Sequence, residues 1–170
     1  MYIFRNTIIG ALAGLLIYFL LSIKLCGIKD NGSISQKLLG KWVAVKVEGK
    51  HIFNDDSESM TATMPPEGDF IQFTQDKEGD SGIFTTVQYG REENGKWELS
   101  AKERIITITY TSFEPSFIMF RRIESISDSD LILTEDGELI KKWVEVNHIM
   151  EDSPKKIVGG YLMEQYVRKD

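Results

Sequence analysis

Short runs of β-branched and aromatic residues recur from Trp42 onward, each bounded by Gly, Asp or Asn, and they constrain the fold most. Eight such runs predict strands at residues 41–48, 69–74, 82–90, 96–101, 104–111, 117–125, 130–134 and 138–147. Asn94-Gly95 and Asp136-Gly137 are typical of two-residue hairpin loops, which need a positive φ. Short antiparallel strands with no helix between them predict an all-β fold, either an up-and-down barrel or a sandwich.

The alternation of side chains within these runs supports the strands. Apolar Trp97 and Leu99 alternate with polar Lys96 and Glu98, as expected when successive side chains point to opposite faces. Residues 54–68 form the longest expected irregular stretch. A short helical turn is expected at Ile34–Leu39, just before the first strand.

The N-terminal part of the chain predicts a membrane anchor. The 18 residues from Asn6 to Ile23 carry no charge, which is nearly enough for a helix to cross a hydrocarbon core of about 30 Å. A cleaved signal peptide would have a shorter apolar region and small residues at the cleavage site. A bacterial lipoprotein would be acylated on a cysteine placed like Cys26, but Leu25 stands where a small residue is usual. We favour the uncleaved anchor and keep Cys26 as the lipidation candidate.

The C-terminal tail predicts a helix. Ser153 can cap it with Pro154 at the first helical position, and apolar residues follow at helical spacing. A final strand is the alternative, because Gly159-Gly160 disfavours a helix interior. The expected organisation is an anchor or signal segment at residues 1–28, a linker at 29–37, a barrel at 38–148 and the tail at 149–170.

Composition and motifs exclude several classes of function. The formal net charge of −6 argues against a nucleic-acid partner. One cysteine and two histidines, His51 and His148, cannot form an intramolecular disulfide or a Cys/His zinc cluster. No Gly-x-Ser-x-Gly or phosphate-binding loop occurs, so no motif places a nucleophile or a phosphate. The sequence predicts no catalytic residue, no metal and no cofactor, and we expect a protein that is not an enzyme.

The run Leu38-Leu39-Gly40-Lys41-Trp42 resembles the start of lipocalin-like barrels, in which a short helical turn leads into Gly-x-Trp. Two later stretches are similar to the small lipocalin-like lipoproteins of bacterial envelopes. They are Phe70–Phe73, and Asp130–Thr134 followed by an Asp-Gly turn and residues 139–146. The likeness covers residues 38–147 by the order of the elements, and it favours the eight-stranded up-and-down barrel over the sandwich.

The resemblance implies roles for several residues and a location. Gly40 and Trp42 would be structural, with the Trp42 ring closing one end of the barrel. Many lipocalins place an Arg or Lys from a late strand over that ring, and Lys142 is a candidate here. The domain would lie on the extracytoplasmic side of the membrane. The count of basic residues around the apolar run, Arg5 against Lys24, Lys29 and Lys37, favours the opposite orientation.

An eight-stranded barrel has an interior that holds either side chains alone or one small ligand. The candidate ligand-binding residues are those expected to face inward or to lie near them: Tyr89, Trp97, Leu99, Ile106, Ile108, Tyr110, Ile118, Phe120 and Arg122. Because Arg122 shares a strand face with Ile118 and Phe120, it is predicted to point inward. There it would hold an anionic head group or pair with a glutamate.

Two hypotheses of function follow. The first is a membrane-anchored envelope protein that binds an apolar or amphipathic small molecule inside the barrel. The alternative is a non-enzymatic interaction module with a solid barrel core that binds a protein partner. A connected apolar cavity of several hundred Å³ would favour the first, as in ordinary ligand pockets.

Overall fold

The computed structural model describes residues 33–76, 79–149 and 153–169. The expected anchor at residues 6–23 and Cys26 lie outside these residues. Within the described part of the chain, no helix combines the length and the apolar character needed to cross a membrane.

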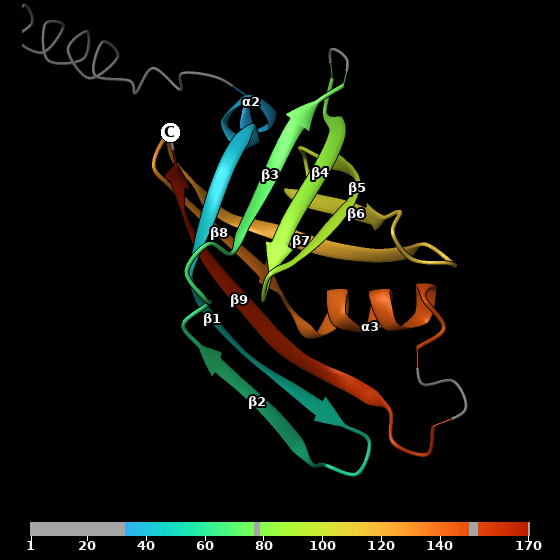
Figure 1. Ribbon diagram of the computed structural model, residues 1–170. Helices are drawn as coiled ribbons and strands as arrows, with labels where there is room; N and C mark the ends of the chain where they lie inside the picture. The colour runs from blue at the N-terminus through green and yellow to red at the C-terminus, as the bar shows by residue number, and fades with distance from the viewer. Residues whose placement is uncertain (1–32, 77–78, 150–152, 170) are drawn as a thin grey trace, which may run out of the picture. The chain divides into compact units, whose positions relative to one another are not determined.

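Eight antiparallel strands form a closed barrel, which confirms the predicted all-β barrel (Figure 1). Hydrogen-bonded neighbours follow the chain order, and the last strand pairs with the first. The barrel strands are β1 (Gly40–Phe53), β3 (Phe70–Gln75), β4 (Ser81–Gln88), β5 (Arg91–Ser100), β6 (Ile105–Tyr110), β7 (Phe117–Ile126), β8 (Asp130–Glu135) and β9 (Ile157–Lys169). Closure leaves no free edge around the barrel wall, which is how such folds avoid edge-to-edge association.

A ninth strand, β2 (Glu58–Thr63), lies within the stretch that was expected to be irregular. It pairs with residues 47–52 of β1, while the same part of β1 pairs with β9 on its other side. β1 and β9 therefore continue beyond the barrel and form a three-stranded extension with β2, as Figure 1 shows. All six residues of β2 are exposed. The polar sequence of β2 lacks the buried apolar face by which strands are recognised.

The two elements after β8 reverse the prediction. Residues 138–147, predicted as a strand, lie in helix α3 (Gly137–Val146), and the tail predicted as a helix is strand β9. Asp136 is not a hairpin residue but the N-cap of α3, where its carboxylate accepts hydrogen bonds from the backbone N–H groups of Glu138 and Leu139 at 3.0 and 2.9 Å. Leu139, Ile140 and Trp143 then form the buried face of an amphipathic helix.

The other predicted turn is displaced. Asn94-Gly95 lies inside β5, and the β4–β5 hairpin turns at Tyr89-Gly90, whose φ values are +52° and +75°. Gly95 is needed for a different reason, because a Cβ there would lie 2.2 Å from the carbonyl oxygen of Thr109 on β6. The glycine therefore permits close approach of two strands rather than a turn.

Two apolar clusters sit on opposite sides of the barrel wall. The first fills the barrel with buried side chains from every barrel strand and from helix α2 (Ile34–Leu38). Within it, Phe73 packs against Phe84 and Trp97, with ring centroids 5.5 and 5.9 Å apart. The second lies outside the wall, where Phe120 of β7 packs with Leu139, Ile140 and Trp143 of α3. The outer face of β7 therefore carries buried apolar side chains as well as its inner face.

Candidate functional site

One end of the barrel, the closed end, is built from Gly40, Trp42 and Arg168. The Arg168 guanidinium lies over the Trp42 ring, 4.3 Å from its centroid, and its Nη1 donates to the carbonyl oxygen of Leu39 at 2.8 Å. The Trp42 Nε1 donates to the carbonyl oxygen of Leu38 at 2.8 Å, so the buried indole has its hydrogen bond. Gly40 has a φ of +121°, and a Cβ there would lie 2.7 Å from Nη1 of Arg168.

The cation over the Trp42 ring is therefore Arg168 and not Lys142, which the sequence predicted. Lys142, the sequence candidate, lies on α3, and its Nζ is 4.1 Å from the centroid of the Phe120 ring, outside the barrel wall. Arg168 is absent from the sequence prediction because it lies within the tail that was expected to be helical. The strand β9 brings it back beside β1, where Trp42 pairs with Arg168 itself.

The polar centre of the barrel is an ion cluster of Arg121, Glu135 and Glu164. Arg121 is 7% exposed and pairs with Glu135, and its Nε lies 2.9 Å from Oε2 of Glu164. The Nε1 of Trp143 also donates to Oε2 of Glu135 at 3.2 Å. Two carboxylates therefore share one guanidinium in a buried setting, where charges are tolerated only when they are paired.

Arg122 does not point inward, so that prediction was wrong. Its Nη2 lies 3.0 Å from Oδ2 of Asp136, and the Arg122 side chain is partly exposed on the outside of the wall. Arg121 pairs in register with the buried Ile106 of β6, which fixes Arg121 as the inward residue. The prediction had relied on apolar Phe120 and Ile118, which are apolar because α3 covers them.

The remaining predicted ligand-binding residues separate into three groups. Trp97, Leu99, Ile106 and Ile108 belong to the buried interior cluster, and Tyr110 packs against that cluster. Phe120 and Ile118 belong to the cluster outside the wall. Tyr89 lies at the rim of the barrel and is 71% exposed. Only the first group and Tyr110 line the interior together.

The free space inside the barrel is small. A cavity of about 10 Å³ lies between Arg121, Glu164 and Tyr110 in the centre, with Tyr166 beside them. That volume is enough for about one water molecule. A hollow of about 460 Å³ lined by Val144, Ile149 and Ile157 lies against α3 rather than in the interior. The interior therefore falls far short of the several hundred Å³ that a ligand pocket occupies.

A second cavity, which we call the mouth cavity, opens where β1 leaves β3. These two strands pair only from Gly40 to Val43, and beyond that point β2 replaces β3 as the partner of β1. The mouth cavity has a volume of about 90 Å³. Its lining shares four residues with the central cavity: Ile71, Gln88, Glu164 and Tyr166.

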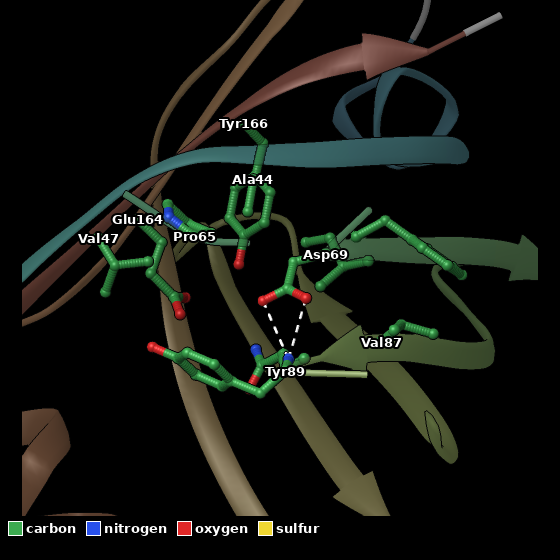
Figure 2. A pocket seen from close by; sticks show the side chains of 11 residues that line it. Ala44, Val47, Pro65, Asp69, Val87, Tyr89, Glu164 and Tyr166 are labelled. Carbon is green, nitrogen blue, oxygen red and sulfur yellow. Dashed lines mark hydrogen bonds between the residues drawn. The ribbon is translucent and has the colours of Figure 1, made fainter. Parts of the chain in front are cut away.

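Polar side chains converge on the mouth cavity. In Figure 2 the carboxylates of Asp69 and Glu164 and the hydroxyl ends of Tyr89 and Tyr166 turn toward the same space. Asp69 is 4% exposed, and its two oxygens accept from the backbone N–H of Tyr89 at 2.9 and 3.1 Å. This contact holds Tyr89 at its positive φ, a conformation that side chains such as tyrosine rarely adopt. The backbone of Tyr89 is thereby held beside the mouth cavity, which the Tyr89 side chain lines.

Burial keeps the interior phenols neutral. It raises the pKa of Tyr110 to about 12, and burial followed by the charge of Glu164 raises the pKa of Tyr166 well above its usual range. Both hydroxyls therefore remain hydrogen-bond donors at physiological pH. Among the described residues, no group of three or more His, Cys, Asp or Glu side chains is arranged to hold a metal ion.

Comparison with known proteins adds little to this geometry. No protein-family model matches the sequence, and no curated protein matches it. A solved structure of a redesigned β-barrel is similar over 82% of this chain and 100% of its own, with 15% identity and a TM-score of 0.37. A score that low carries no argument, so the barrel assignment rests on the hydrogen-bonded closure between β1 and β9.

Proposed function

We propose that this protein is a non-enzymatic, membrane-anchored interaction module of the cell envelope, whose filled barrel is a scaffold for binding a partner protein at the mouth. One observation carries the proposal: aliphatic and aromatic side chains fill the barrel and leave a mouth cavity of only about 90 Å³. An ordinary ligand pocket needs about 300–1,000 Å³. A protein surface, in contrast, needs only a recess that accepts one of its side chains.

We also propose that the chain is lipocalin-like. The support comes from the closed end, where Gly40-Lys41-Trp42 opens the first barrel strand and Arg168 of the last strand covers the Trp42 ring. The closed eight-stranded barrel in chain order is consistent with that family. Residues 6–23 would then anchor the chain as a single span, or Cys26 through a lipid, with the barrel on the extracytoplasmic side.

A second candidate function is binding of an amphipathic small molecule. The observation that favours it is the set of buried polar groups, Asp69, Glu164 and Tyr166, around the mouth cavity. Such a molecule would place only its head group in the mouth cavity, and its apolar part would lie outside on the rim. This differs from the sequence-based hypothesis, which placed an apolar ligand inside the barrel.

The test is site-specific photo-crosslinking of the full chain in its native membrane. A photoreactive residue replaces Tyr89 at the mouth or, as a matched control, Tyr161 of β9, which is 45% exposed. We expect one protein adduct of defined mass from position 89 and none from position 161. A solvent-extractable adduct of lipid-like mass at position 89 would support the second candidate instead. Equal labelling at both positions would contradict a binding site at the mouth.

A further inference from the structure

The mouth cavity has an excess of negative charge. Its lining includes the carboxylates of Asp69 and Glu164 and, among the residues that the structure describes, no Lys, Arg or His. Arg121 lies deeper and is shared between Glu164 and Glu135, so its single charge balances only one of those two carboxylates. A buried charge without a full counter-charge is costly. A cation entering the mouth cavity would supply the missing charge.

Aromatic rings flank the same space. Tyr166 lines the inner side of the mouth cavity and Tyr89 lines its outer side. The face of a tyrosine ring attracts a cation, and the attraction increases where water is excluded. Hydrogen-bond acceptors and aromatic residues around one recess are features that suit an ammonium group.

The volume of the mouth cavity and the side chains at its rim restrict which class of cation can bind. About 90 Å³ is several times the roughly 10–15 Å³ that one water molecule needs on this scale, but it is far below the roughly 300–1,000 Å³ of an ordinary ligand pocket, so it accepts a small head group and not a bulky one. The rim is apolar, because Pro65 lines the mouth cavity and the adjacent Met64 is 86% exposed. An alkyl chain that leaves the mouth cavity would therefore cross apolar side chains before it reaches water.

We propose that the mouth cavity binds a primary ammonium group on an alkyl chain, either a free alkylamine or a lysine side chain of the partner. Glu164 and Asp69 supply the charge, and the ring of Tyr89 covers the alkyl chain. This inference rests on the proposed function only in one respect, namely that the mouth is the contact site. It does not require a partner protein, because a free amine would bind to the same groups.

The experiment is a titration of the full chain in detergent micelles, followed by NMR of ¹⁵N-labelled protein. The probe is n-butylammonium chloride, and the reporter is the backbone amide of Tyr89, which is bonded to Asp69. We expect a saturable shift of this amide. Equal concentrations of n-butanol and sodium n-butyrate, which match the chain length without the positive charge, should leave it unmoved. An equal shift with n-butanol would overturn the proposal.

Variants locate the binding site. Glu164→Gln and Asp69→Asn should each weaken n-butylammonium binding by on the order of tenfold, equivalent to about 1.4 kcal/mol. Glu98→Gln, on the exposed outer face of β5, is the matched control and should bind normally. Glu164→Gln can also impair folding, because Glu164 pairs with buried Arg121. Tyr89→Ala, at an exposed position, is therefore tested as well and is compared with Tyr161→Ala. For these two variants the backbone amide of Gln88 is the reporter. Unchanged affinity in the folded mouth variants would overturn the proposal.

A second arm distinguishes the two sources of the ammonium group. N-acetyl-lysine amide is compared with its Nε-acetylated form. Binding of the first and not the second supports a partner lysine, while binding of n-butylammonium alone supports a free amine. The titration and the crosslinking experiment also distinguish failure of this inference from failure of the proposed function. Saturable n-butylammonium binding without a protein crosslink at position 89 would support the ammonium site and contradict the partner protein. A protein crosslink at position 89 without n-butylammonium binding would support the partner protein and contradict the ammonium site.

Discussion

The closed end and the mouth of the barrel are built from the same two strands, β1 and β9, and yet they differ in chemistry. At the closed end, Trp42 and Arg168 pair in register, and the guanidinium has carbonyl partners and a ring beneath it. Five residues further along β1, Val47 pairs with Glu164, which lines the mouth cavity together with a second carboxylate, that of Asp69. The difference shows that a filled barrel can concentrate its buried polar groups away from its closed end.

The largest expected effect concerns the ion cluster near the mouth. Arg121→Met leaves Glu135 and Glu164 buried without their cation, and we expect a loss of about 3–5 kcal/mol in the free energy of unfolding. Arg122→Met is the matched control, because its partner Asp136 is half exposed, and it should lose about 1 kcal/mol or less. Chemical denaturation of both variants measures the comparison. Similar losses would mean that the interior charges are not specially sensitive.

A smaller effect is expected at the closed end. Gly40→Ala adds a Cβ at 2.7 Å from Nη1 of Arg168 and also strains a residue with φ of +121°. Gly68→Ala has a similar strain, with φ of +100°, but its Cβ meets nothing within 4 Å. We expect both variants to lose about 1–3 kcal/mol from backbone strain, with the greater loss in Gly40→Ala. Thermal unfolding of both variants measures this difference in stability. Equal losses in Gly40→Ala and Gly68→Ala would show that the Arg168 side chain moves away from the added Cβ at no cost.

The smallest effect is expected outside both ends, at the cap of α3. Asp136→Ala should lose about 1 kcal/mol, and Asp136→Asn should lose less, because Asn caps helices as well as Asp does. Hydrogen bonds from the Leu139 backbone, then from Arg122, lower the pKa of Asp136. A carboxyl group with a lowered pKa stabilises the fold above its unfolded pKa of 3.8, and this contribution is lost as pH falls through the folded pKa.

This sign can be checked by unfolding measurements over a range of pH. The difference in stability between the wild-type protein and Asp136→Asn should be constant near neutral pH and should shrink below about pH 4. A difference that grows in acid would contradict the capping role of the charged carboxylate.

Residue patterns were sufficient wherever a strand has one buried face. The alternation around Trp97 and Ile106 predicted β6 closely and the second half of β5, and Gly40-Lys41-Trp42 marked the start of the barrel. The prediction failed where a face is buried by something other than the barrel interior. Phe120 looked like an inward residue because α3 makes its outer environment apolar. β2 was missed for the opposite reason, because it buries no face.

The amino-acid sequence by itself determined the all-β class and the approximate positions of seven of the eight barrel strands, because alternation and strand propensity are local properties that neighbouring residues express. Only the tertiary structure decided which arginine of Arg121-Arg122 faces inward, and that α3 precedes the closing strand. Both depend on register, since a shift of one residue would reverse the face of every side chain on β7. That register places Arg121 with Glu135 and Glu164, and with it the acidic mouth of the barrel.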